Sequence, residues 1–476
     1  MAMPEKLNLL SKRSRKRPER LPRTLQDGSR IAVIGAGPAG SMFSYFLLNM
    51  AEAVGLDVGV DIFEPRHFCH RGPAGCNHCG GIVSESLVQR LATEGIMLPD
   101  GVVQRGIESY TLHMDVGDVK IATPLMEKRI AAIYRGNGPL HSEPLDTHSF
   151  DGYLLELAQQ QGAKVIHRLV TNVRHKDELM RVDCADQHSA DYDLVAVATG
   201  VNSRLMETLE NQTQECRRPG RTKTFICEFH LGHKVIRETF GPSMHVFFLD
   251  IPRLKFAALI PKGDYVTLCL LGTDIDDELM QQFFNSAEVK NCFPNGTIPD
   301  HVCHCYPRIN VKAARPGYGD RVVMIGDSGT TRLFKDGIGA AYRTAKAAAK
   351  TAVFHGVGAE DFKTHYAPVC QAISNDNQVG KVVFGFGTMV QRARFARRGV
   401  LRMTANEQKQ TGRPRRMSGV LWDLFSGSAP YTDVFLRTLH PAYIGGLVWN
   451  LVAGNMPGSA ARNGHAPRAE CDHVKH

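Results

Sequence analysis

The patterned part of the chain begins with a strand, a glycine turn and a helix. Residues 31–34 form a short β-branched run that predicts a buried strand, and residues 41–48 have the apolar character of a helix. A second strand is predicted over residues 58–63. This order, within about 35 residues, is the one that a βαβ crossover between parallel strands requires.

Further apolar patterns predict two kinds of structure downstream. A helix over 150–163 and strands at 164–167, 194–197 and 321–325, with an Ala-rich helix over 339–354, continue the nucleotide-domain character. Residues 107–134 look like alternating strands and a turn. Alternating strands within 222–275, including 244–249, 255–260 and 266–271, suit an antiparallel sheet, and residues 360–456 look largely helical.

The first turn has the sequence of a dinucleotide-binding motif. Its glycines and their neighbours are Gly35, Gly37, Pro38, Ala39 and Gly40, and the acidic Glu64 follows the second strand. In this context a first glycine permits the tight turn, a second lets the backbone approach a pyrophosphate, and a third allows close helix–strand packing. The helix N-terminus favours the phosphates, and Glu64 is placed to accept hydrogen bonds from the adenosine ribose.

Two distant segments favour FAD over NAD as the ligand. One is the strand that ends at Thr199-Gly200, and the other is the strand that ends at Gly326-Asp327, followed by the turn Gly337-Ile338-Gly339. Asp327 is placed to bond the ribityl hydroxyls, and the Gly-Ile-Gly turn offers N–H groups to the flavin or the pyrophosphate. A dehydrogenase that binds only NAD has no need of this late second contact.

These motifs, with Cys79-Gly-Gly81 and Phe150-Asp-Gly-Tyr-Leu-Leu155, resemble the FAD-dependent oxidoreductases of para-hydroxybenzoate-hydroxylase type, and within them the geranylgeranyl reductase branch. The resemblance spans about residues 30–350. It implies the reduction of isolated double bonds in polyprenyl chains on the flavin. The sequence contains no motif that we can assign to covalent attachment, so we expect noncovalent FAD. The resemblance also implies that the loop of Cys79 lies near the flavin, where the thiol is a candidate catalytic group.

The expected fold class is α/β, a Rossmann-like FAD-binding domain with an inserted antiparallel β-sheet substrate domain and a helical C-terminal region. The expected boundaries are a basic flexible tail at 1–28, the FAD-binding domain at 29–200 and 315–356, the β-rich substrate domain at 201–314, the helical region at 357–456 and a loose tail at 457–476.

Two close cysteine pairs leave alternatives open. Cys76 and Cys79 form one pair, and Cys303 and Cys305 the other. If the fold joins the pairs, four thiolates could bind zinc or an iron–sulfur cluster. Otherwise they are ordinary thiols, with Cys76 or Cys79 as the candidate for redox chemistry beside the flavin.

Charge is concentrated at the N-terminus. Residues 1–30 hold nine Lys/Arg and three acids, so most of the formal charge of +9 belongs to this tail rather than to a nucleic-acid-binding face. The tail lacks the apolar core of a secretory signal, and no stretch approaches a spanning helix, so we expect a cytoplasmic protein.

A basic and aromatic C-terminal pattern has two interpretations. Five arginines lie between 392 and 402, three more follow at 413–416, and apolar runs occupy 421–425 and 443–449. The pattern suits either peripheral contact with an anionic membrane on its inner face or a solvated face over a helical cap.

The leading functional hypothesis is an FAD-dependent reductase of an unsaturated, lipophilic, isoprenoid-like substrate. No second G-x-G-x-x-G is present, so the electron donor is expected to be transiently bound NAD(P)H or another protein. The alternatives are a flavin monooxygenase acting on an aromatic or quinone substrate, and an electron-transfer flavoprotein subunit of a membrane complex.

Overall fold

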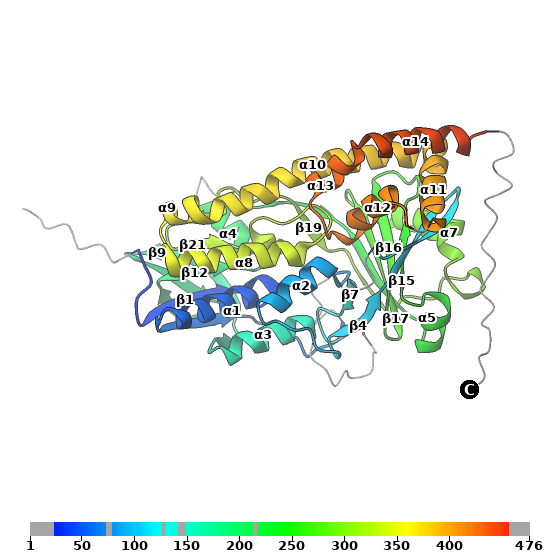
Figure 1. The fold of residues 1–476 in the computed structure, drawn as a ribbon. Helices are drawn as coiled ribbons and strands as arrows, with labels where there is room; N and C mark the ends of the chain where they lie inside the picture. Colours follow the sequence, from blue (N-terminus) through cyan, green and yellow to red (C-terminus); the bar gives the residue numbers. More distant parts are fainter. Residues whose placement is uncertain are drawn as a thin grey trace, which may run out of the picture.

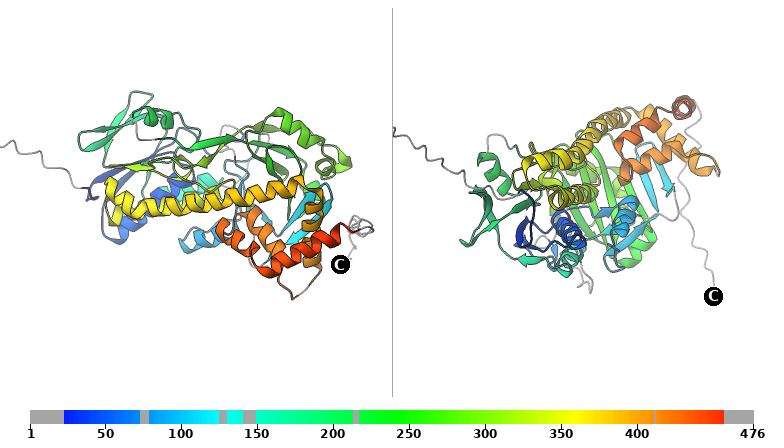
Figure 2. Two further views of the ribbon diagram at one scale, coloured as in Figure 1. Left: turned by 90° about the horizontal axis from the view of Figure 1, so that it is seen from above. Right: turned by 60° about the vertical axis from the view of Figure 1, so that its left-hand side comes forward.

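The computed structural model describes residues 23–72, 79–124, 130–140, 149–212, 217–410 and 412–456. Most of the predicted basic tail, all of the predicted loose tail and Cys76 lie outside these ranges. The described elements form two side-by-side units, each a sheet covered by helices, with the long helix α10 (Ala367–Arg392) running across both (Figures 1 and 2).

The first unit contains a mostly parallel sheet. In the described part of the chain it has six strands in the order β20-β21-β12-β1-β2-β8, and only β20 runs antiparallel to its neighbour. The strands are β1 (Ser29–Ile34), β2 (Val58–Phe63), β8 (Lys164–Ile166), β12 (Leu194–Val197), β20 (Tyr318–Gly319) and β21 (Val322–Met324). The strands β1, β2, β8, β12 and β21 are each predicted from the sequence, and only β20 is not.

Helices cover one face of this sheet. The apolar sides of α1 (Pro38–Ala53), α3 (Phe150–Gln160) and α8 (Gly337–Phe354) pack with its strands into one core. The opposite face packs against β9 (Val170–Lys176), β10 (Leu179–Cys184), β11 (Ser189–Tyr192) and α4 (Leu205–Gln212). Both faces are therefore buried, which explains why the central strands read as continuous apolar runs.

The second unit contains a larger sheet of seven described strands in the order β18-β14-β17-β16-β15-β5-β6. They are β5 (Ser109–Met114), β6 (Gly117–Ala122), β14 (Phe225–His230), β15 (Ser243–Phe247), β16 (Leu254–Lys262), β17 (Tyr265–Gly272) and β18 (Cys303–Cys305). One face packs under α10, α11 (Arg394–Lys409), α12 (Arg416–Ser426) and α13 (Tyr431–Thr438), and the other under α5 (His233–Thr239), α6 (Asp277–Asn285) and α7 (Ala287–Lys290).

This sheet differs from the prediction in two respects. It was expected within 201–314, but β5 and β6 join it from a segment that had been assigned to the first part of the FAD-binding domain. It was also expected to be antiparallel, but β15 and β5 pair in parallel, with His245 beside Thr111 and Phe247 beside His113. Alternation along a strand shows that one face is buried but does not identify the neighbouring strand, so the sequence could not reveal this long-range pairing.

The remaining described elements connect and cap these units. Short strands form a β3-β7-β4 sheet and a β13-β19 ribbon: β3 (Ile82–Val83), β4 (Val103–Ile107), β7 (Ile130–Ile133), β13 (Gly220–Lys223) and β19 (Arg308–Lys312). The other helices are α2 (Glu85–Thr93), α9 (Ala359–Asp361) and α14 (Pro441–Gly454). The prediction that residues 360–456 are largely helical is confirmed.

Candidate functional site

The predicted glycine turn lies at the carboxyl edge of the parallel sheet, between β1 and α1. Gly35 has a φ of +103°, and a Cβ there would lie 2.6 Å from the carbonyl oxygen of Ala198, directly after the neighbouring strand β12. At Gly40 a Cβ would lie 1.9 Å from the carbonyl oxygen of Gly35. Both glycines are therefore required by close backbone contacts, Gly35 with the segment after β12 and Gly40 within the turn itself.

Gly37 is different, because the space at its Cα is open. The nearest atom to a Cβ at this position is a guanidinium nitrogen of Arg135, at 3.7 Å. Gly37 is the N-cap of α1, and no side chain caps this helix. The N-terminus of α1 therefore faces open space with a nearby cation, which is the environment that a helix offers to an anionic group.

Glu64 follows β2 directly and is buried. One of its carboxylate oxygens accepts a hydrogen bond from the backbone N–H of Ala36 at 3.1 Å, and the other accepts one from the N–H of Arg66 at 3.1 Å. The first bond ties the carboxylate to the glycine turn. Because an ionised carboxylate has about four acceptor positions, this arrangement leaves acceptor capacity for further hydroxyl donors.

Segments from the far end of the sequence meet the same turn. Gly326, just after β21, packs on Ala39 so closely that a Cβ on Gly326 would lie 2.7 Å from that of Ala39. Gly337 lies at the start of α8, close to Asp327. A Cβ added at Gly337 would lie 3.9 Å from the Oδ1 of Asp327. Gly200 is tied to the same region, since its N–H donates to the Ser328 hydroxyl at 2.9 Å.

The second helix N-terminus at this edge resembles the first. Helix α8 begins at Gly337 after Asp336, which has a left-handed backbone, and it has no side-chain cap. Burial raises the pKa of the Asp327 carboxyl, while a hydrogen bond to Thr331 and the charge of Arg135 oppose that shift. All three predicted groups, Gly35–Gly40, Gly326-Asp327 and Gly337–Gly339, thus lie together; their role as cofactor ligands remains a prediction.

Arg135 links this edge to the second unit. Its guanidinium makes a bidentate ion pair with Asp151 on α3, whose carboxylate is fully buried; one of the two bonds, from Nη2 to Oδ2, is 2.8 Å. Burial lowers the pKa of Arg135, but the Asp151 carboxylate outweighs it and raises the pKa above its ordinary value. Cys79 lies near the same guanidinium and contributes to the raised pKa of Arg135.

The loop of Cys79 is held between the two units. The Cys79 sulfur accepts a hydrogen bond from the N–H of Gly81 at 3.4 Å. A Cβ on Gly80 would lie 2.8 Å from the Cys269 sulfur, and one on Gly81 would lie 2.0 Å from the Ile133 carbonyl oxygen. Only glycines fit here, so the backbone after Cys79 passes directly over β7 and the large sheet.

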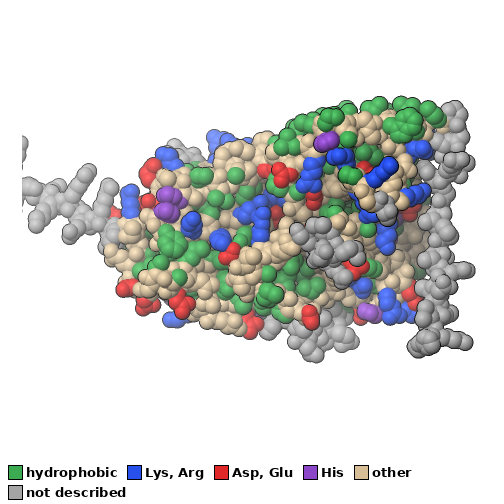
Figure 3. Space-filling model, in the orientation of Figure 1, with side chains coloured by type: hydrophobic (Ala, Val, Ile, Leu, Met, Phe, Trp, Pro, Cys, Tyr) green, Lys and Arg blue, Asp and Glu red, His purple; other side chains and the backbone are tan. Residues whose placement is uncertain are grey.

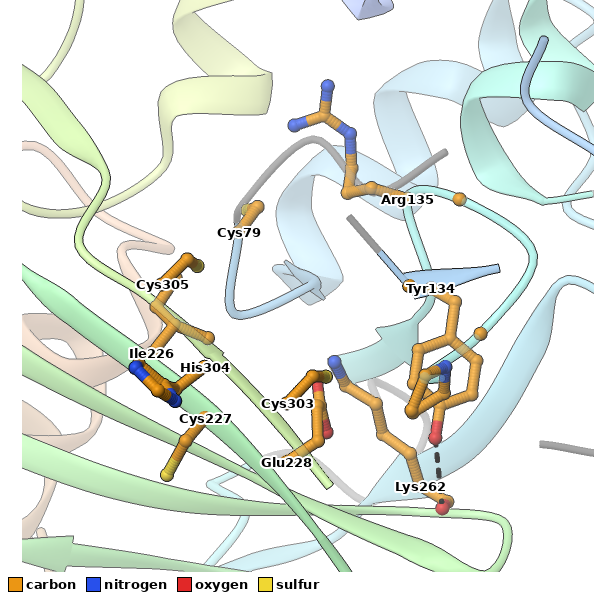
Figure 4. A pocket seen from close by; sticks show the side chains of 14 residues that line it. Cys79, Tyr134, Arg135, Ile226, Cys227, Glu228, Lys262, Cys303, His304 and Cys305 are labelled. Carbon is orange, nitrogen blue, oxygen red and sulfur yellow. Dashed lines mark hydrogen bonds between the residues drawn. The ribbon is translucent and has the colours of Figure 1, made fainter. Parts of the chain in front are cut away.

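An open pocket adjoins this loop, enclosing about 520 Å³ including the part that merges with solvent. Figure 4 shows Cys79 and Arg135 on one side of it and the strands β14 and β18 on the other. Its lining includes Cys79, Tyr134, Arg135, Glu228, Lys262 and Cys303. The pocket therefore lies at the junction of the nucleotide-type sheet and the large sheet.

Proton-exchanging groups converge on this junction. The Lys262 ammonium lies 4.9 Å from the centre of the Tyr134 ring, and burial raises the pKa of Glu228 while the charge of Lys262 opposes the shift. Lys335, four residues before Gly339, lies near Cys79 and Cys269; burial lowers its pKa from 10.5 to about 8. Such perturbed groups are typical of sites that transfer protons.

The cysteine pairs are partly brought together. Cys79, Cys303 and Cys305 line the same pocket, whereas Cys76 lies outside the described residues. The three described thiols do not form a metal-sized group of ligand atoms; among the residues with described positions, only His113, His245 and Cys292 do so. Burial raises the pKa of Cys303, which favours its thiol form.

Several residues of the site could not be identified from the sequence. Arg135, Lys262 and Lys335 come from three separate segments, and none belongs to a recognisable motif. A signal that could have pointed to Arg135 is its position directly after the apolar run of β7, at a strand end.

The basic C-terminal region divides into buried and exposed parts. Arg397 is buried and makes a bidentate ion pair with Asp115. The expectation that it contributes to a basic surface is therefore wrong. Trp422 is fully buried, whereas Trp449 is 66% exposed. In the described part of the chain, no helix combines the length and apolar character needed to cross a membrane.

Several solved structures share the fold of this chain. A geranylgeranyl bacteriochlorophyll reductase-like protein from Thermoplasma acidophilum is 13% identical, with a TM-score of 0.61 over 87% of this chain and 99% of that one. A flavoprotein/dehydrogenase from Cytophaga hutchinsonii is 15% identical, with a TM-score of 0.61 over 90% of this chain and 99% of that one. The halogenase PltM, in complex with phloroglucinol and FAD, is 13% identical, with a TM-score of 0.56 over 91% of this chain and 98% of that one.

No protein-family model matches the chain, and no curated protein sequence is significantly similar to it. At these identities the structural matches define the fold. The chain therefore has the fold shared by this reductase-like protein, this flavoprotein/dehydrogenase and this halogenase, and the resemblance stated from the sequence is confirmed at that level.

Proposed function

We propose that this protein is an FAD-dependent oxidoreductase that reduces a double bond of a lipophilic substrate. The observation that carries the proposal is the convergence of three glycine segments, from residues 35–40, 326–327 and 337–339, at one edge of the parallel sheet beside the Cys79 pocket. The solved FAD complex of the halogenase PltM has the same fold, which supports FAD as the cofactor.

The residues at this edge fit the parts of FAD. The uncapped N-terminus of α1 and the open space at Gly37 suit the pyrophosphate, and Arg135 adds a positive charge beside it. Glu64 would hold the adenosine ribose, and Asp327 the ribityl hydroxyls. The N-terminus of α8, at Gly337–Gly339, would offer backbone N–H groups to the flavin ring or the pyrophosphate.

Bound FAD would supply a hydride to the substrate, and the protein would supply the matching proton. Reduction of an isolated double bond adds one hydride and one proton, so an acid must stand beside the acceptor carbon. Cys79 is the candidate, because its thiol lines the pocket beside the Arg135 guanidinium and accepts a hydrogen bond from the N–H of Gly81. Lys262 and Glu228 line the same pocket and could return a proton to Cys79.

Anaerobic turnover distinguishes this function from its alternatives. The purified protein is reduced with dithionite under argon and mixed with a polyprenyl diphosphate or its alcohol. We expect flavin reoxidation and a product heavier by two hydrogen masses. Oxygen-dependent NADPH oxidation stimulated by a phenol would instead identify a monooxygenase, and a cluster absorbance with no substrate turnover would identify an electron-transfer subunit.

We further propose that the C-terminal helices rest on an anionic membrane, from which a lipophilic substrate could be drawn. Of the sixteen exposed large apolar side chains in the described residues, eleven lie between 382 and 456. Figure 3 shows hydrophobic side chains gathered along the upper edge, over α10 and α14, with Lys and Arg side chains below them. An apolar stripe beside cations is typical of an interfacial helix.

Vesicle binding tests this surface with a matched control. The variant Val448→Ser/Trp449→Ser removes two side chains that are 54% and 66% exposed on α14. The control Met97→Ser/Leu169→Ser removes two that are 65% and 56% exposed elsewhere. With vesicles of equimolar phosphatidylserine and phosphatidylcholine, we expect at least about tenfold weaker binding for the first variant only. Equal binding of both variants would contradict the proposal.

A further inference from the structure

Two histidines and one cysteine form a buried group on the large sheet, apart from the pocket residues described above. His113 lies on β5 and His245 on β15, neighbouring parallel strands, and Cys292 follows α7 across that face of the sheet. Each residue is less than a tenth exposed. Three segments that are far apart in the sequence therefore bring a thiol and two imidazoles to one place.

The ligand atoms of these residues face one another. His113 Nε2 lies 2.9 Å from His245 Nδ1, and Cys292 Sγ lies 3.6 Å from the first nitrogen and 3.5 Å from the second. Tetrahedral zinc, with Zn–N of about 2.0–2.1 Å and Zn–S of about 2.3 Å, requires N···N of about 3.3 Å and N···S of about 3.6 Å. The two sulfur distances agree with this geometry, and the nitrogens need to separate by only about 0.4 Å.

The surroundings favour a metal with nitrogen and sulfur ligands. The ring of His113 stacks on Phe247 with centroids 4.9 Å apart, and that of His245 meets Phe240 edge-on at 4.9 Å. These contacts fix the orientation of both imidazoles. Asp118 pairs with His113 across the β5–β6 ladder, and its negative charge acts on both His113 and Cys292. A Cys292 thiolate and the Asp118 carboxylate would together balance a divalent cation, against the one positive charge of Lys120 that acts on His245.

We propose that His113, His245 and Cys292 bind one zinc ion that ties β5 and β15 to the segment after α7. Three protein ligands leave the fourth position for water. This site does not depend on flavin binding, since it shares no residue with the glycine turns or with Cys79. It is also distinct from a site built on Cys79, Cys303 and Cys305, whose thiols do not form a metal-sized group in the described structure.

The test is the zinc content of the full-length, untagged protein, purified from zinc-supplemented medium without chelators. We expect about one zinc per chain in the wild type and less than about one tenth of that in Cys292→Ser and His245→Ala. The double variant Cys303→Ser/Cys305→Ser and the buried-thiol control Cys184→Ala should keep their zinc. Zinc that is lost in the double variant and kept in Cys292→Ser would overturn the proposal, as would a wild type without zinc.

A spectroscopic measurement guards against misfolded variants. Wild-type protein stripped of metal is titrated with Co²⁺, and we expect a thiolate-to-cobalt charge-transfer band and the strong visible bands of tetrahedral cobalt at one equivalent. His113→Ala should lose these bands while it keeps the same far-UV circular dichroism. Octahedral cobalt spectra in the wild type would contradict the assignment.

Discussion

Gly37 and Gly40 stand in the same turn, but substitutions at them should fail in opposite ways. Gly37 has φ −64° and ψ 178°, which any residue adopts, and the nearest atom to an added Cβ is a guanidinium nitrogen at 3.7 Å. Gly37→Val should therefore change the free energy of unfolding by no more than about 1 kcal/mol, the scale of an N-cap substitution.

At Gly40 the added Cβ would stand 1.9 Å from the Gly35 carbonyl oxygen, a backbone atom that cannot rotate away. Gly40→Ala should therefore lower the free energy of unfolding by about 3 kcal/mol or more, the upper range for overpacking. Even the larger side chain of valine is thus tolerated at Gly37, whereas the single methyl group of alanine is not tolerated at Gly40.

Flavin content completes the comparison. If the pyrophosphate lies against Gly37, the valine occupies its place, and flavin content should fall at least about tenfold, which is about 1.4 kcal/mol of binding free energy. The assay is the ratio of flavin absorbance to protein absorbance after gel filtration, beside a urea unfolding curve. Gly59→Val is the control, because Gly59 is exposed near the start of β2 and no atom lies within 4 Å of an added Cβ. Full flavin in a folded Gly37→Val would refute the placement.

Three further predictions concern the groups around the pocket. Cys79→Ala should retain FAD and lose turnover because the thiol supplies the proton; unchanged turnover means that Cys79 only packs. Arg135→Met leaves the fully buried Asp151 carboxylate without its ion-pair partner and should lower the free energy of unfolding by about 3–5 kcal/mol, measured by urea titration. Arg174→Met removes a more exposed ion pair and should lower it by less than about 1 kcal/mol. The pKa of Lys335 is about 8 in the folded protein against 10.5 ordinarily, so between these pH values only the unfolded chain keeps the proton. Wild type should therefore gain stability relative to Lys335→Met as the pH rises from 8 to 10.5, and a difference that stays constant would show that Lys335 is solvated.

The sequence was sufficient for the local elements of the nucleotide-type unit. The apolar runs of β1, β2, β12 and β21 and the glycine turn at 35–40 carry their own signals, because a strand buried on both faces reads as a continuous apolar stretch. The motif at Gly326-Asp327 could be placed beside the turn because parallel strands end at one edge of their sheet.

The pocket could not be predicted in the same way. Arg135, Lys262 and Lys335 acquire their roles from contacts between distant segments, and no spacing in the sequence encodes those contacts. The pairing of β5 with β15, which brings His113 to His245, is a further long-range contact of this kind. At Arg397 the sequence pattern gave a wrong prediction. Its position in a basic run predicted a surface cation, but the side chain is buried beside Asp115.

The flavin content of the purified full-length protein tests the central claim most directly. The protein is isolated anaerobically, denatured, and its released cofactor quantified by chromatography and mass spectrometry, with an aliquot first incubated with added FAD. The account predicts about one FAD per chain, released without covalent attachment. A colourless protein that also fails to retain added FAD would contradict it, because the glycine segments at 35–40, 326–327 and 337–339 would then meet for packing alone.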